Sequence, residues 1–125
     1  PNPNRVARQT TIFQEGYGAQ VVGEGLKVFA KTLEKLESSL AHSEYLVGER
    51  ISLADIGILP YVNEVIRFGL DQMAEDKPLT RAWFDRMSAR DSYGVAIAGV
   101  LGEAQWDAIA DRGRKAWPAM RNHLS

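Results

Sequence analysis

The stretch that decides the fold is YLVGERISLADI, residues 45–56. Ser52 is a favourable N-cap residue, and Asp55 follows at the third helical position, where its carboxylate can reach back to the amide of the cap. Ile51 and Ile56 occupy the two positions of a hydrophobic staple across the same helix start. The stretch therefore predicts a helix that begins directly after Ser52.

Helical periodicity continues on both sides of this stretch. The predicted helix 53–68 is apolar on most sides, which is typical of the buried centre of a bundle, although Pro60 should kink it. Apolar residues spaced three and four apart predict further helices over 5–14, over 24–41, from Pro78 onward and in the tail 103–124. Glycines 16, 18, 23 and 25 predict a break between the first two helices, because each costs about 1 kcal/mol in a helix. We expect an all-α helical bundle that forms a single domain over residues 1–125.

Composition limits the classes of function. Of the 125 residues, 45% are hydrophobic and 25% are charged, the formal net charge is −1, and cysteine is absent. A chain so close to neutral has no overall electrostatic attraction to nucleic acid. No apolar run approaches the roughly 20 residues that span a bilayer. We therefore expect no nucleic-acid or membrane partner and no metal site, and the lack of cysteine fits a cytoplasmic location.

Residues 45–56 resemble the C-terminal helical domain of cytosolic glutathione transferases, in which a Gly-acidic turn leads into a Ser/Thr-x-x-Asp box at the start of the central helix. The resemblance extends to about residue 98 through the segments 2–7, 33–37, 77–83 and 86–90. Asp91 and Ser92 stand where the family usually has Pro-Ser. No segment resembles the family's N-terminal thioredoxin-like domain, which supplies the glutathione site and the residue that activates the thiol. The resemblance therefore implies no catalytic residue in this chain.

The resemblance also implies where a substrate would lie. In the family, the first helix of this domain faces the active-site cleft and lines a pocket for a hydrophobic electrophile. The candidate pocket residues share one face of the predicted first helix and are Gln9, Thr10, Phe13 and Tyr17. The alternative is that these residues belong to the bundle core or to plain surface. Trp117 in the tail is a further candidate, because tails cover this pocket in the family; a simple docking helix is the alternative.

Ser52 and Asp55 are interpreted as a structural cap. A buried aspartate beside a cleft could act as a general base, but the spacing alone explains both residues. Loss of the cap in Asp55→Ala is expected to cost on the order of 1–3 kcal/mol.

Two classes of function follow. In the first, the chain is the C-terminal domain of a glutathione transferase-like protein: it forms the wall of the substrate pocket and part of a homodimer surface. It is inactive alone, binds no cofactor alone, and needs a thioredoxin-like domain to supply glutathione. In the second, it is a stand-alone protein-interaction or scaffold module of the same fold. The reading frame upstream of Pro1 distinguishes the two.

Overall fold

The computed structural model describes residues 3–125, without the side chain of Phe13, and this part of the chain folds into helices with no named strand. The elements are α1 (Pro3–Glu15), η1 (Gly16–Gly18), α2 (Gln20–Leu40), α3 (Leu53–Arg67), η2 (Asp71–Ala74), α4 (Pro78–Ser88), α5 (Asp91–Ala96), η3 (Ala98–Val100), α6 (Glu103–Met120) and η4 (Arg121–His123). The predicted all-α fold is confirmed.

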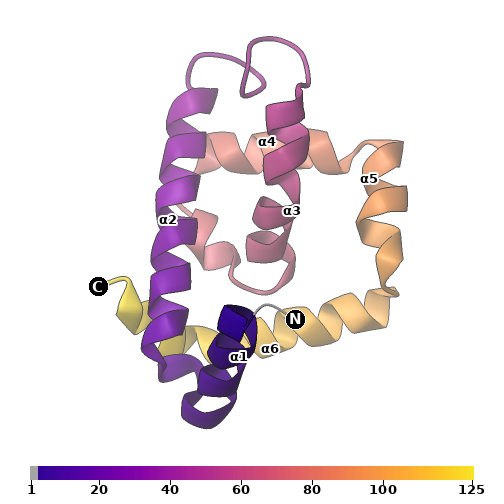
Figure 1. Ribbon diagram of the computed structural model, residues 1–125. Helices are drawn as coiled ribbons and strands as arrows, with labels where there is room; N and C mark the ends of the chain where they lie inside the picture. Colours follow the sequence, from indigo (N-terminus) through magenta and orange to yellow (C-terminus); the bar gives the residue numbers. More distant parts are fainter. Residues whose placement is uncertain (1–2) are drawn as a thin grey trace.

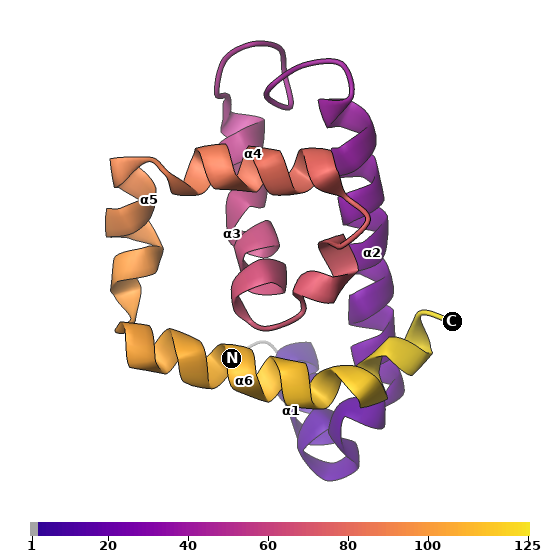
Figure 2. The ribbon, with the colours of Figure 1, turned by 180° about the vertical axis from the view of Figure 1, so that it is seen from behind.

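The helices other than α1 form a frame around the central helix, α3. Figure 1 shows α2, α4, α5 and α6 surrounding α3, with α1 near the corner where α2 and α6 meet. The view from behind shows the same arrangement, with α4 now crossing in front of α3 and α6 passing in front of α1 (Figure 2). The frame covers α3 from the sides and from one face, so the two faces of this helix meet different environments.

The core lies where α2, α3, α4 and α6 converge. Leu33, Val62, Val65, Trp83 and Met87 are each at most 1% exposed. In α2 the buried leucines at 26, 33, 36 and 40 recur at helical spacing, so one stripe of that helix packs inward. Helical periodicity in the sequence therefore placed this part of the core correctly.

Helix α2 begins at Gln20, four residues before the predicted start, and includes two of the glycines that were expected to break it. Gly16, with a φ of 71°, makes the turn instead. Gly23 is buried, and a Cβ atom on it would lie only 2.6 Å from Nδ1 of His123. Glycine fits at position 23 because the side chain of His123 packs directly against the backbone there.

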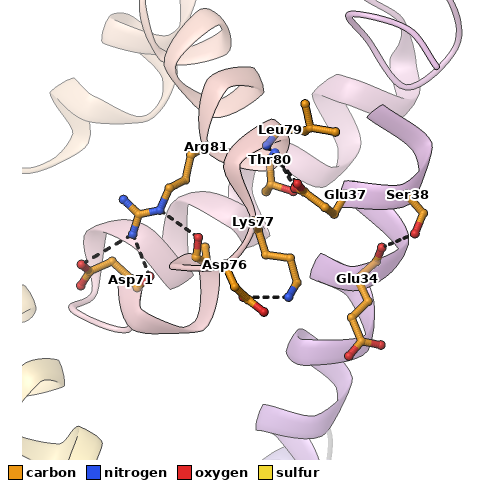
Figure 3. Close-up of polar contacts among 10 residues, drawn as sticks. Glu34, Glu37, Ser38, Asp71, Asp76, Lys77, Leu79, Thr80 and Arg81 are labelled. Atoms are coloured by element: carbon orange, nitrogen blue, oxygen red, sulfur yellow. Dashed lines mark hydrogen bonds and ion pairs between the residues drawn. The ribbon is translucent and has the colours of Figure 1, made fainter. Parts of the chain in front are cut away.

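Helix α4 is held at its N-terminus by a side chain from α2. The carboxylate of Glu37 accepts hydrogen bonds from Leu79 N (3.0 Å), Thr80 N (2.8 Å) and Thr80 Oγ1 (2.7 Å) (Figure 3). Burial alone would raise the pKa of Glu37, but these bonds and the charge of Lys77 outweigh it and leave the pKa below its usual value. Glu37 thus stabilises the end of α4 by satisfying free N–H groups.

On the other side of α4, Arg81 donates to the carbonyls of Ala74 (2.9 Å) and Asp71 (3.0 Å), and so fixes η2 beneath the helix (Figure 3).

Helices α3 and α6 approach each other closely at Gly69 and Gly113. A Cβ on either glycine would collide with the backbone of the facing segment. None of the described helices is long and apolar enough to cross a membrane.

Candidate functional site

Helix α1, which carries most of the candidate pocket residues, is largely open to solvent. Gln9 and Thr10 are exposed, and the Thr10 hydroxyl donates to the carbonyl of Val6 at 3.0 Å. Val6 is itself 49% exposed. The side chain of Phe13 lies outside the described residues, so the prediction for Phe13 has no structural outcome. An exposed helix with apolar residues on its surface can form the wall of a pocket that another domain completes.

Tyr17 borders a hollow. It lies in η1, is 49% exposed, and lines a cavity of about 270 Å³ together with residues from the end of α3 and from α6, among them Phe68 and Ile109. The carbonyl oxygen of Tyr17 lies 3.3 Å from Nε2 of His123. The C-terminal segment thus holds η1 in place while the tyrosine ring faces the hollow.

Trp117 lies elsewhere. It is 8% exposed, belongs to the main core cluster, and does not line the hollow beside Tyr17. The buried residues of α6 are Trp106, Ala116, Trp117 and Met120. Within this chain, Trp117 therefore packs in the core and not beside Tyr17, and a role in a pocket completed by another domain stays a prediction.

Ser52 and Asp55 lie together at the start of α3. Ser52 is the N-cap residue, and Oδ2 of Asp55 accepts from its backbone N–H (2.9 Å) and from its hydroxyl (2.7 Å). Oδ1 of Asp55 accepts from Leu46 N (3.0 Å) and from Trp83 Nε1 (2.8 Å). One carboxylate therefore joins the helix start, the preceding loop and α4.

The environment of Asp55 does not suit a general base. Its side chain is fully buried. Burial raises its pKa, but the four hydrogen bonds lower it further, so the net shift is downward. A general base works best with a pKa near the working pH, and a carboxylate whose acceptor sites are occupied has none to offer a substrate. Asp55 is a structural anchor.

Trp83 and Leu46, the long-range partners of Asp55, were not predicted. Trp83 is fully buried, and its indole N–H donates to a carboxylate 28 positions earlier in the chain. Its place among the apolar residues of the predicted α4 indicated a core residue. A buried indole N–H needs a hydrogen-bond acceptor. This need was the signal that could have linked Trp83 to Asp55, the acid in the first turn of the central helix.

Tyr93 carries a buried hydroxyl group. It donates to Oδ1 of Asn63 at 2.6 Å, and burial raises its pKa despite the nearby positive charge of Arg67. A hydroxyl that stabilises a thiolate must point at the thiol, whereas this one is paired within the core. No three histidine, cysteine, aspartate or glutamate side chains gather as a metal site within residues 3–125.

The central helix exposes an apolar stripe. Leu53 is 85% exposed, and Ile56 and Tyr61 are each 55% exposed. Gly57 and Pro60 lie between them and are exposed as well. These positions follow helical spacing, so they form one face of α3, and we call this face the open stripe. The buried face of the same helix carries Leu59, Val62, Asn63 and Val65. The prediction that this helix, apolar on most sides, is the buried centre of the bundle is thus correct for one face and wrong for the other.

The comparisons with known proteins agree with this fold. The family model described as "Glutathione S-transferase, C-terminal domain" matches residues 6–91. Glutathione S-transferase F10 of Arabidopsis thaliana is 31% identical over 75 residues, which cover 59% of this chain and 35% of the relative. A probable glutathione S-transferase GSTF1 of Oryza sativa subsp. japonica is 33% identical over 73 residues, 58% of this chain and 33% of the relative.

A third relative, glutathione S-transferase stcT of Emericella nidulans, is 41% identical over 58 residues, 46% of this chain and 27% of the relative. The matches thus span about a third of the length of these curated relatives. No solved structure matches the chain significantly. Because the family model matches well over half of the chain and the described fold is all helical, the chain belongs to the glutathione S-transferase C-terminal domain family.

Proposed function

We propose that this chain is the C-terminal domain of a glutathione-dependent transferase and that a thioredoxin-like domain packs against the open stripe of α3. The open stripe is the observation that carries the proposal. It lies on the helix that the family resemblance identifies as the centre of the domain, yet Leu53, Ile56 and Tyr61 are each more than half exposed. Contiguous apolar surface of this kind marks an interaction site, and fully burying such a side chain contributes about 1.5–3 kcal/mol.

The residues present in this chain indicate which parts of the active site each of the two domains would supply. Glutathione and the group that activates its thiol would come from the thioredoxin-like domain. Helix α1 and η1 would supply the wall of a pocket for a small hydrophobic electrophile, through Gln9, Thr10, Phe13 and Tyr17. The hollow of about 270 Å³ beside Tyr17 supports this part of the proposal, because it is lined mainly by apolar side chains next to an exposed ring. Asp55 and Tyr93 are both committed to internal hydrogen bonds, which supports the view that the chain is not catalytic alone.

In the chain alone, where no thioredoxin-like domain covers the open stripe, this exposed surface supports a homodimer. Two-fold pairing is the commonest closed assembly, and a net charge of −1 offers little repulsion between copies. A cytoplasmic location belongs to the same proposal.

The test compares two proteins. The chain alone and the complete product of its reading frame are assayed with glutathione and an aryl halide. We expect the chain alone to match the uncatalysed rate and the complete protein to exceed it. In the complete protein, Ile56→Asp should lower both turnover and stability by weakening the contact between the domains. Val95→Asp is the matched control, because Val95 is 83% exposed on α5 and is not part of the open stripe.

Two results would contradict the proposal. Turnover by the chain alone, clearly above the uncatalysed rate, would show that the thioredoxin-like domain is not needed. A reading frame that holds no thioredoxin-like segment, together with an inactive product, would favour the alternative, an interaction module of the same fold.

A further inference from the structure

A separate hollow lies where the C-terminal end of α3 meets the first half of α6. Its volume is about 340 Å³, which is within the range of small-molecule sites in proteins. The residues that line it are Ile66, Arg67, Glu103, Trp106, Asp107 and Ala110. None of them belongs to the open stripe or lines the hollow beside Tyr17. Since half of these residues are charged, we call this site the charged hollow.

The tryptophan of the charged hollow, Trp106, is fixed from two sides. Its indole N–H donates to the carbonyl of Ala98 at 2.9 Å. The centre of its ring lies 6.1 Å from that of Phe68. Trp106 is 8% exposed, so its ring forms a fixed wall of the hollow.

Trp106 in turn holds the guanidinium of Arg67. The Cζ atom of Arg67 lies 5.0 Å from the centre of the indole ring, which is a cation–π contact. Within residues 3–125 this guanidinium has no ion-pair or hydrogen-bond partner. A guanidinium that stacks on a ring keeps the N–H groups at its edge free, and these can donate to a carboxylate in pairs. Arg67 is therefore positioned to receive an anionic group.

Two carboxylates line the same hollow from α6. Glu103 and Asp107 are about one turn apart, so they lie on one face of this helix, and both are exposed. Neither forms an ion pair in the part of the chain that the structure describes. Opposite charges that line one hollow without meeting leave room between them for a molecule that carries both charges.

We propose that the charged hollow binds a free α-amino acid with an apolar side chain. The carboxylate of the amino acid accepts paired N–H bonds from Arg67, and its ammonium group donates to Glu103 or Asp107. Its side chain packs on the apolar part of the lining, Ile66 and Ala110. A simple carboxylate would be repelled by the two acids and a simple amine by the arginine, so the hollow favours a zwitterion. The inference rests on the charged hollow alone and does not depend on the transferase proposal.

The experiment titrates the 125-residue chain with leucine and with two analogues of the same carbon skeleton. Isocaproate lacks the ammonium group, and isoamylamine lacks the carboxylate. Of the three tryptophans only Trp106 lines the hollow, so its indole N–H signal in NMR spectra reports binding, while the signals of Trp83 and Trp117 are internal references. The variant Trp106→Phe assigns the signal. We expect leucine to shift it and to bind about tenfold more tightly than either analogue, because each analogue lacks one charged pair.

Two variants separate the two ends of the ligand. Arg67→Gln should weaken leucine binding about tenfold and leave the binding of isoamylamine no weaker, because only the carboxylate loses its partner. The double variant Glu103→Gln and Asp107→Asn should weaken leucine binding to a similar degree and leave the binding of isocaproate no weaker. Arg114→Gln and Glu34→Gln, at exposed positions that do not line the hollow, are the matched controls and should change neither.

Several results would overturn the proposal. An analogue that binds as tightly as leucine would show a site for a single charge. Leucine binding that survives either variant, or shifts centred on Trp83 or Trp117, would place the ligand elsewhere. An unmoved Trp106 signal at millimolar leucine would overturn the proposal as well. Circular dichroism checks that Arg67→Gln folds. If it does not, the double variant carries the test, because both of its positions are exposed.

Discussion

Replacing Asp55 by alanine tests how the loop, the central helix and α4 are held together. The change removes the acceptor of three N–H groups, those of Leu46, Ser52 and the Trp83 indole. A buried donor left without a partner costs about 1–3 kcal/mol, and the Ser52 hydroxyl can turn elsewhere. The two amides are only partly buried and can gain water, so we expect a total loss of about 3–6 kcal/mol. This is larger than the 1–3 kcal/mol expected from the cap alone.

Such a loss is a large fraction of the roughly 5–15 kcal/mol that stabilises a domain. Urea unfolding followed by circular dichroism and by tryptophan fluorescence measures it from the midpoint and the slope. Asp107→Asn, at an exposed position of α6, is the control and should stay within about 0.5 kcal/mol of the parent. An unchanged midpoint for Asp55→Ala would refute the claim that one carboxylate joins the three segments.

The pH dependence of Asp55→Asn separates charge from shape. The folded-state pKa of Asp55 is lowered, so its charge stabilises the fold fully above the unfolded pKa, about 3.9, and this contribution is lost as the pH falls through the folded pKa. The stability difference between the parent and Asp55→Asn should therefore be constant near neutral pH and shrink below about pH 4. A difference that stays constant into strong acid would show that the charge contributes nothing.

Three further predictions concern the frame and its surface. Glu37→Gln should lower the free energy of unfolding by about 1–2 kcal/mol, because the amides of α4 lose a charged acceptor. Glu34→Gln, at an exposed position of the same helix, is the control and should have almost no effect. Equal effects of the two changes in urea unfolding would contradict the capping role of Glu37. Gly113→Ala should destabilise the fold by about 1–3 kcal/mol, since the new Cβ meets the backbone at Phe68. Gly25→Ala has open space around the new Cβ and should stabilise the fold by up to about 1 kcal/mol. Thermal unfolding measures both, and a neutral Gly113→Ala would mean that α3 and α6 are further apart than the structure places them. The chain alone should sediment as a dimer at micromolar concentration, and Leu53→Asp should shift it toward monomer more than Val95→Asp does; a monomeric parent would argue against association through the open stripe.

The local pattern around Ser52 and Asp55 was enough to place the start of α3, because a helix N-terminus is defined by residues within one turn of each other. The buried leucines of α2 were predictable for a similar reason, since helical periodicity depends only on neighbours along the chain. The family resemblance also arises from these local segments. These parts of the molecule can be predicted without knowing which distant segments they contact.

Other features depend on contacts between distant segments. The start of α2 at Gln20 became possible because His123, about a hundred positions later, packs on Gly23 and offsets the poor helix propensity of glycine. The bond between Trp83 and Asp55 spans 28 positions, and although a buried indole N–H needs an acceptor, only the tertiary structure decided which acid supplies it.

The open stripe is the clearest case. An apolar side chain in a sequence shows that its burial would be favourable, but not which surface covers it. Only the arrangement of the frame around α3 decided that Leu59 and Val62 are buried within this chain while Leu53 and Ile56 stay open to solvent, because hydrophobic burial has no direction of its own and follows whichever surfaces the fold brings together.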